Sequence, residues 1–186
     1  MRTQSTIYTL VLSAILCAIG IMIPMFSPLK LILPTMSFTL GSHVVIFIGM
    51  FISVKVGVAV SLGTTIGFFF GGFPPSVVAR ALSHIVFATI GGFWIKKYPN
   101  TIKNRKNSIV FSFVLAIVHA IFEVLAIIPF YFTNALSPLA YDNGFLYSVL
   151  LLIGFGTIAH SIVDFEIALF INNAILRRGK NRVMPV

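Results

Sequence analysis

The sequence predicts an all-α membrane protein, built as one integral-membrane domain (residues 1–186) of six transmembrane helices with both termini in the cytoplasm. Three observations predict this class. Of the residues, 58% are hydrophobic and 9% are charged, whereas a soluble domain carries about 25% charged residues. Apolar runs of membrane-spanning length recur along the chain. All but two of the 13 Lys and Arg residues fall on one side of a six-span arrangement.

Six segments come close to or exceed the ~20 apolar residues that a helix needs to cross the hydrocarbon core. The first continues to about Met25 without a small-residue cleavage site, so we expect a retained helix and not a signal peptide. The second is short, and Ser53 and Lys55 favour a break before the third. The last is long enough to tilt or to extend beyond the bilayer. The expected helices are about 7–26, 38–53, 55–72, 75–95, 108–132 and 145–175.

Basic residues set the orientation, because cytoplasmic loops of membrane proteins carry an excess of Lys and Arg. Clusters lie at 96–106, between the fourth and fifth helices, and at 177–182, after the sixth. The exceptions are Lys30, in the first outer loop, and Arg80, inside the fourth helix. The net charge of +9 is therefore a topology signal. A membrane-lipid environment is expected, and a nucleic-acid partner is not.

The outer loops are expected at 27–37, 71–75 and 133–144. The first is unusually apolar, and prolines at positions 24, 28 and 34 prevent a regular helix there. Two interpretations of this loop remain open. It is either a lid over a pocket or an interfacial segment that rests among lipid headgroups.

Ionisable residues inside the predicted helices are the strongest functional signal, because a charge at the bilayer centre costs roughly 2.5–3.5 kcal/mol on insertion scales. Three pairs have i, i+4 spacing, which puts both members on one helical face. His43 stands alone on the second helix. The expected depths allow Arg80, His84 and Glu123 to line one cavity open to the outside. The pairs are Arg80/His84, His119/Glu123 and His160/Asp164.

Two roles remain open for Arg80: its planar donor fork suits the carboxylate of an anionic ligand, or it pairs with Glu123 as structural glue between helices. For His160 and Asp164 we favour a hydrogen-bonded pair that fixes the sixth helix. Thr157 lies on the same helix. The expected substrate-binding residues are Arg80, His84, Glu123, His119, Thr157 and His160.

Enzyme signatures are missing from the sequence. It has no HExxH motif, no GxSxG motif and no P-loop, so we expect no catalytic residues, and any ATP-driven work has to come from another chain. Cys17 is the single cysteine, which excludes an internal disulfide. No cofactor and no metal are expected, because the histidines and carboxylates lie on different helices at different expected depths.

The first helix carries a stripe of small residues in which Ala14 and Ala18 are one turn apart, extended by Ser13 and Gly20. Small side chains allow the close backbone approach on which helix association in lipid depends. The stripe serves either packing within the bundle or docking onto a partner protein.

Taken together, these features resemble the substrate-binding S components of energy-coupling factor (ECF) vitamin transporters: six helices with both termini inside, Ala-x-x-x-Ala on the first helix, an apolar first outer loop and a basic loop between the fourth and fifth helices. The resemblance covers essentially the whole chain. The segments "MSFTLGSHVVIFIGMFIS" and "GTTIGFFFGGFPPSVVARALSHIVFATIGG" further resemble the branch for small carboxylated vitamins, nicotinate or pantothenate.

The resemblance implies a bundle of the S-component type that captures a vitamin from outside, between the fourth to sixth helices and under the first outer loop. Arg80 is then placed to hold the vitamin's carboxylate. Ala14 and Ala18 would dock on a shared membrane scaffold subunit, which two separate ATPase subunits drive. The alternative suggested by the buried histidine pairs is a stand-alone proton-coupled carrier or channel for a small organic molecule.

Overall fold

Apolar helices make up most of the computed structural model, which describes residues 2–32 and 37–181. A short antiparallel hairpin, in which Leu31 pairs with Phe38, interrupts them after the first helix. In chain order the elements are α1 (Arg2–Phe26), β1 (Lys30–Ile32), β2 (Ser37–Thr39), α2 (Val44–Ile52), α3 (Val54–Phe70), α4 (Pro75–Lys97), α5 (Arg105–Phe132), η1 (Pro138–Ala140), η2 (Leu146–Phe155) and α6 (Gly156–Asn181).

Four helical stretches in the described part of the chain are long and apolar enough to cross a membrane, and α3 is a shorter apolar helix. The membrane helical bundle is thus confirmed in its class, whereas six full spans are not. The last stretch runs without interruption through η2, a π-helix, into α6. The four stretches are Thr6–Phe26, Pro75–Lys97, Arg105–Phe132 and Leu146–Leu176.

The expected helix over 38–53 is wrong in its first part. Residues 37–39 form strand β2, a turn follows, and α2 begins only at Val44. Gly41 has a φ of +86°, a left-handed conformation that glycine adopts without steric cost. Non-helical backbone at membrane depth is tolerated where it is buried in protein or lines a cavity, and this segment lines one. The apolar composition of 38–53 could not reveal that.

The expected break between the second and third helices is confirmed. Ser53 is extended, with φ −168° and ψ 159°, and its side chain accepts a hydrogen bond from the backbone N–H of Val56. The two helices then pack closely side by side, because Gly49 faces Gly57. A Cβ atom added at Gly57 would lie 3.1 Å from the backbone of Met50, closer than an ordinary van der Waals contact, so glycine favours this approach.

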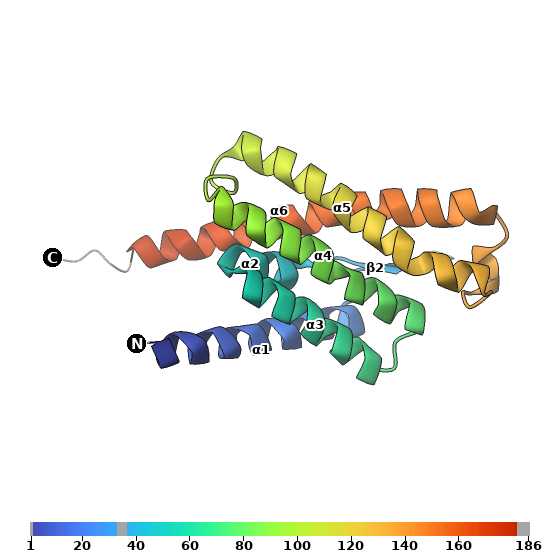
Figure 1. Ribbon diagram of the computed structural model, residues 1–186, viewed down its shortest axis with the longest axis horizontal. Coiled ribbons are helices and arrows are strands. Elements are labelled where there is room, and N and C mark those ends of the chain that lie inside the picture. The colour runs from blue at the N-terminus through green and yellow to red at the C-terminus, as the bar shows by residue number, and fades with distance from the viewer. Residues whose placement is uncertain (1, 33–36, 182–186) are drawn as a thin grey trace.

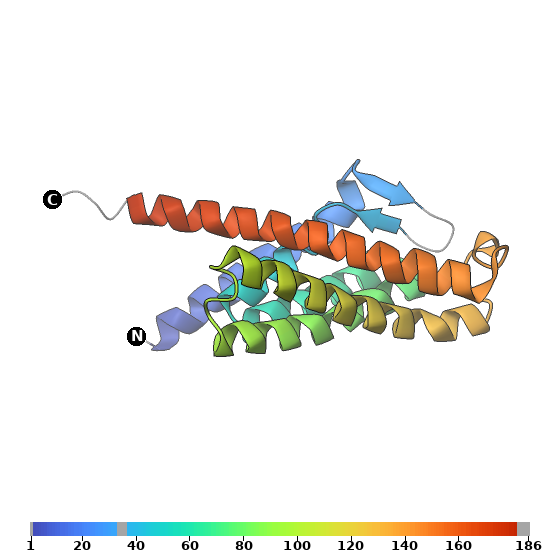
Figure 2. The same ribbon diagram turned by 90° about the horizontal axis from the view of Figure 1, so that it is seen from above.

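The start of α1, the end of α6 and the 98–104 connection lie at one end of the bundle, and the connections at 71–74 and 133–145 lie at the other (Figure 1). The hairpin stands beside the middle of α6, away from the α4–α5 layer (Figure 2). The grouping of the connections is the one that the basic residues predict.

The core between the helices is built largely from aromatic rings. Phe47 packs against Phe87 and Phe165 with ring centroids 5.3 and 5.4 Å apart, and all three side chains are fully buried. Phe87 also contacts the ring of His119, at 4.4 Å between centroids. Tilted and edge-on ring pairs of this kind are favourable beyond their buried area. The aromatic core therefore provides a rigid floor for the polar residues above it.

Candidate functional site

A cavity lies in the interior of the bundle where the hairpin, the start of α2 and helices α3 to α6 meet. The volume of the cavity that is open to the centre of a water molecule is about 60 Å³. A single bound water occupies ~10–15 Å³ of such volume. The cavity therefore has room for several waters or one small ring. Phe38, Phe68 and Phe73 supply apolar lining. The main polar lining residues are Lys30, Ser42, His43, Arg80, His84, Glu123 and His160.

Glu123 is the hub of the polar contacts around this cavity, and its side chain is 1% exposed. One carboxylate oxygen, Oε2, accepts hydrogen bonds from Arg80 at 2.9 Å and from Thr157 at 2.5 Å. The other, Oε1, lies 3.1 Å from Nε2 of His84 and 3.5 Å from Nε2 of His119. The fold thus gathers four of the other five residues that the sequence nominated around the carboxylate of Glu123.

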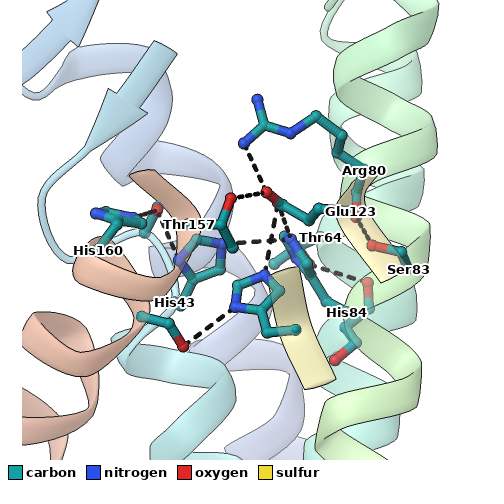
Figure 3. A network of polar contacts seen from close by, with 12 residues as sticks. His43, Thr64, Arg80, Ser83, His84, Glu123, Thr157 and His160 are labelled. Atoms are coloured by element: carbon teal, nitrogen blue, oxygen red, sulfur yellow. Dashed lines mark hydrogen bonds and ion pairs between the residues drawn. The ribbon is translucent and has the colours of Figure 1, made fainter. Parts of the chain in front are cut away.

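Arg80 makes the ion pair that one of the two open interpretations required, since Nη2 donates to Glu123 (Figure 3). This ion pair occupies only one of the three nitrogen atoms of the guanidinium group. Its Nε is buried and has no hydrogen-bond partner among the described residues. The guanidinium carbon lies 5.9 Å from the ring centroid of Phe38, within the range of a cation–π contact. Arg80, which lines the cavity, is therefore anchored at one nitrogen and keeps donors that Glu123 does not use.

His43 is the site residue that the sequence left isolated. It comes just before α2, and its Nε2 lies 3.3 Å from Nε2 of His84. Its ring also stacks edge-on against the rings of His119 and His160, at 4.7 and 4.8 Å between centroids. No spacing rule within one helix could find it, because its partners come from three other helices. A buried histidine in an apolar segment was the available signal.

Asp164 ties the start of α2 to α6. Its two oxygens accept hydrogen bonds from the backbone N–H groups of Gly41, at 2.8 Å, and His43, at 2.9 Å. A carboxylate at this position satisfies donors at the helix start and suits the helix dipole. His160 lies 3.3 Å from Asp164, as the spacing predicted. The expectation that this pair fixes only the sixth helix was too narrow, since the carboxylate also holds α2.

The expectation that the histidines and carboxylates are separated in depth is wrong. Ligand atoms of His43, His84, His119 and Glu123 all lie within 4.8 Å of one another. The physical reason is the start of α2 inside the bundle, which brings His43 to the level of the residues on α4 and α5. The argument from depth against a metal site therefore fails.

Lys30 is a second residue that sequence reasoning did not nominate. It starts β1 and lines the cavity, and its Nζ donates to the carbonyl oxygen of Pro24 at 2.7 Å. The available signal in the sequence was its predicted position in an outer loop, since the other lysines are expected on the cytoplasmic side. With Arg80 and Glu123, it gives the cavity lining two cations and one carboxylate, which favours an anionic ligand.

A comparison with known proteins places the chain. It is 38% identical over 172 residues to the niacin transporter NiaX of Lactococcus lactis subsp. cremoris (strain MG1363), covering 92% of this chain and 76% of that protein. The chain belongs to the family of this transporter. The resemblance to the S components of ECF vitamin transporters is thereby confirmed, and the chain is a multi-pass protein of the cell membrane. No family model matches it, and no solved structure does.

The small-residue stripe on α1 divides between two faces of that helix. Ser13 and Gly20 are buried, and a Cβ atom added at Gly20 would lie 2.6 Å from the side chain of Thr64 on α3. Ala14 and Ala18 are exposed. Packing within the bundle therefore accounts for Ser13 and Gly20 and leaves the two alanines on a free surface of this transporter-family chain.

Proposed function

We propose that the chain is the nicotinate-binding S component of an ECF-type importer, and that it holds the vitamin in the cavity beside Arg80. The observation that carries the proposal is the anchored Arg80, with its unpartnered buried Nε, in a cavity of a chain related to a niacin transporter. A guanidinium binds a carboxylate through two parallel hydrogen bonds. Arg80 and Lys30 together supply the positive charge, and Glu123 keeps the guanidinium in place.

The shape of the cavity favours nicotinate over pantothenate. The cavity is small, with about 60 Å³ open to the centre of a water molecule. This volume suits nicotinate, a single aromatic ring with one carboxylate, better than pantothenate, a branched chain with an internal amide. Phe68 and Phe73 are stacked, with centroids 4.6 Å apart, and both line the cavity with Phe38. Aromatic walls around a few convergent polar groups are the usual design of a small-molecule site.

The hairpin serves as the lid in this proposal. Phe38 and Thr39 of β2 and Lys30 of β1 line the cavity, so movement of the hairpin would open a path from the side on which the 71–74 and 133–145 connections lie. With both termini in the cytoplasm, as the basic residues predict, that side faces outward. The vitamin would then enter from outside.

Docking onto the importer would use the exposed face of α1. Ala14 and Ala18 lie on it among exposed apolar side chains, including Val11 and Ile15. Two small residues one turn apart allow a partner helix to approach closely. The proposed partners are a shared membrane scaffold subunit and two ATPase subunits, which would supply the ATP hydrolysis for which this sequence has no P-loop.

Mass spectrometry of small molecules released from the purified, denatured chain tests the ligand directly. Nicotinate at close to one per chain is the expected result, followed by tighter equilibrium binding of nicotinate than of nicotinamide or pantothenate. Release of pantothenate would reassign the vitamin. Uptake by the purified chain alone, driven by a pH gradient in vesicles without ATP or partner subunits, would replace the S-component proposal with a stand-alone carrier.

A further inference from the structure

Four side chains with metal-binding atoms converge on one point at the floor of the cavity. They come from three separate parts of the fold: the start of α2, helix α4 and helix α5. One ligand atom from each lies within 4.8 Å of all the others, and every one of these side chains is at least nine-tenths buried. The four residues are His43, His84, His119 and Glu123.

Three of the six separations between these atoms are close to those of a tetrahedral metal site, and all six are within 4.8 Å. Zn²⁺ binds imidazole nitrogen and carboxylate oxygen at about 2.0–2.1 Å, so neighbouring ligand atoms in a tetrahedron lie about 3.3 Å apart. The two Nε2 atoms of His43 and His84 are 3.3 Å apart. Oε1 of Glu123 lies 3.1 Å from Nε2 of His84 and 3.5 Å from Nε2 of His119.

Hydrogen bonding alone leaves this cluster incomplete. Nε2 of His84 lies within hydrogen-bond reach of both Nε2 of His43 and Oε1 of Glu123, and one imidazole nitrogen carries either a single proton or a single lone pair, so it cannot satisfy both contacts. Nε2 of His119 is buried and has no hydrogen-bond partner among the residues described, although it points at Glu123. A buried polar atom without a partner costs about 1–3 kcal/mol. A cation at the centre would accept the lone pairs of all three rings at once.

In two of the imidazole rings, the nitrogen that faces away from the cluster has a polar partner, as is usual for metal-binding histidines. Metal-binding histidines usually donate their other N–H to a carboxylate or hydroxyl group, which fixes the tautomer. Nδ1 of His43 lies 3.3 Å from Asp164, and Nδ1 of His119 lies 3.2 Å from Oγ of Ser161. Asp164 is better suited to this outer role than to direct ligation, because both its oxygens already accept backbone N–H groups.

We propose that His43, His84, His119 and Glu123 bind a divalent transition-metal ion, with Zn²⁺ the best match. Three imidazoles and one carboxylate form a donor set typical of zinc, and the oxygen-only shell preferred by Mg²⁺ or Ca²⁺ is not present in this cluster. The carboxylates of Glu123 and Asp164 would offset the two positive charges of the ion, and the guanidinium of Arg80 adds one positive charge. The site would therefore keep a net positive charge, which a carboxylate ligand in the same cavity would neutralise.

The metal content of the purified chain tests this site. The chain is purified without a histidine tag, loaded with Zn²⁺, dialysed and measured by inductively coupled plasma mass spectrometry. We expect about one Zn²⁺ per chain, and Co²⁺ loading should give the visible absorption of a tetrahedral N/O site. His119→Gln should lose most of the bound metal. Ser161→Ala, which removes only the partner of Nδ1, should weaken metal affinity by about 10–100-fold.

His160→Gln is the discriminating variant, because His160 lines the same cavity and belongs, with His43 and Asp164, to a second group of possible metal ligands but not to these four. It should retain the metal. Size-exclusion profiles and circular dichroism of each variant establish that the chain remains folded. Absence of stoichiometric Zn²⁺ or Co²⁺ in the folded wild-type chain would overturn the proposal, as would equal loss of metal in His160→Gln and His119→Gln.

The metal also deepens the proposed function, on which this last step rests. An ion at the cavity floor would raise nicotinate affinity, and by linkage nicotinate would raise metal affinity by the same factor. Chelation should therefore weaken nicotinate binding in the wild type but not in His119→Gln. The two proposals fail separately: metal without nicotinate binding contradicts the vitamin assignment, and nicotinate binding without metal contradicts this site.

Discussion

Replacing Arg80 by alanine is the sharpest test of the proposed vitamin site. The Arg80 side chain is 9% exposed and that of its partner Glu123 is 1% exposed, so the change removes one member of a desolvated charge pair. Such removals cost about 2–5 kcal/mol of binding energy. If the guanidinium also holds the nicotinate carboxylate, affinity should fall by roughly 30-fold to several thousand-fold.

The comparison of acid and amide ligands separates the two roles of Arg80. Nicotinamide has the same ring without the negative charge. In equilibrium binding to the purified chain, Arg80→Ala should weaken nicotinate strongly and nicotinamide little. Arg80→Lys should restore part of the acid affinity, because an ammonium group lacks the planar fork. Arg105→Ala is the matched control: its ion pair with Glu166 is exposed, and such pairs contribute about 0–1 kcal/mol.

A double variant gives the result that would refute the reasoning. Arg80→Ala leaves Glu123 buried with Thr157 and His84 as its remaining close partners, so some loss of stability is expected in any case. Adding Glu123→Gln removes the stranded charge. If tight nicotinate binding returns in this double variant, Arg80 serves only Glu123. If binding stays weaker than in Glu123→Gln alone while thermal stability recovers, the guanidinium acts on the vitamin itself.

Four further predictions concern other parts of the molecule. Lys30→Ala should weaken nicotinate more than nicotinamide in the same assay, since it removes the second cation of the cavity lining; equal loss for both ligands would make Lys30 structural. Ala18→Leu should leave nicotinate binding intact and lower ATP-dependent uptake with partner subunits, whereas lost binding would show that this face packs internally. In a chain without the native cysteine, a cysteine at Asn134 should react with impermeant thiol reagents in intact cells and one at Asn104 should not; the reverse would invert the topology. Gly57→Ala should destabilise the chain by about 1–3 kcal/mol in thermal unfolding, because its Cβ would meet backbone atoms at 3.1 Å, and an unchanged melting temperature would contradict the close packing of α2 and α3.

The sequence by itself determined the membrane class and nominated most of the polar residues that the structure gathers around the cavity. These properties depend on composition and local spacing. A buried charge in an apolar run is costly wherever it lies, so Arg80, Glu123 and the paired histidines could be nominated without a structure. The helix break at Ser53 was also local, since it depends on a polar residue between two apolar stretches. The family followed from the same patterns and was confirmed by the relative.

Only the tertiary structure decided which of these groups meet. Helical spacing relates His119 to Glu123, but it says nothing about His43, which reaches the cluster because α2 begins inside the bundle at Val44. That late start depends on long-range contacts, namely the hydrogen bonds from Gly41 and His43 to Asp164, more than 120 residues away in the sequence. Depths assigned from separate helices cannot anticipate such a contact. The convergence of the four proposed metal ligands is a property of the packed bundle and not of any one segment.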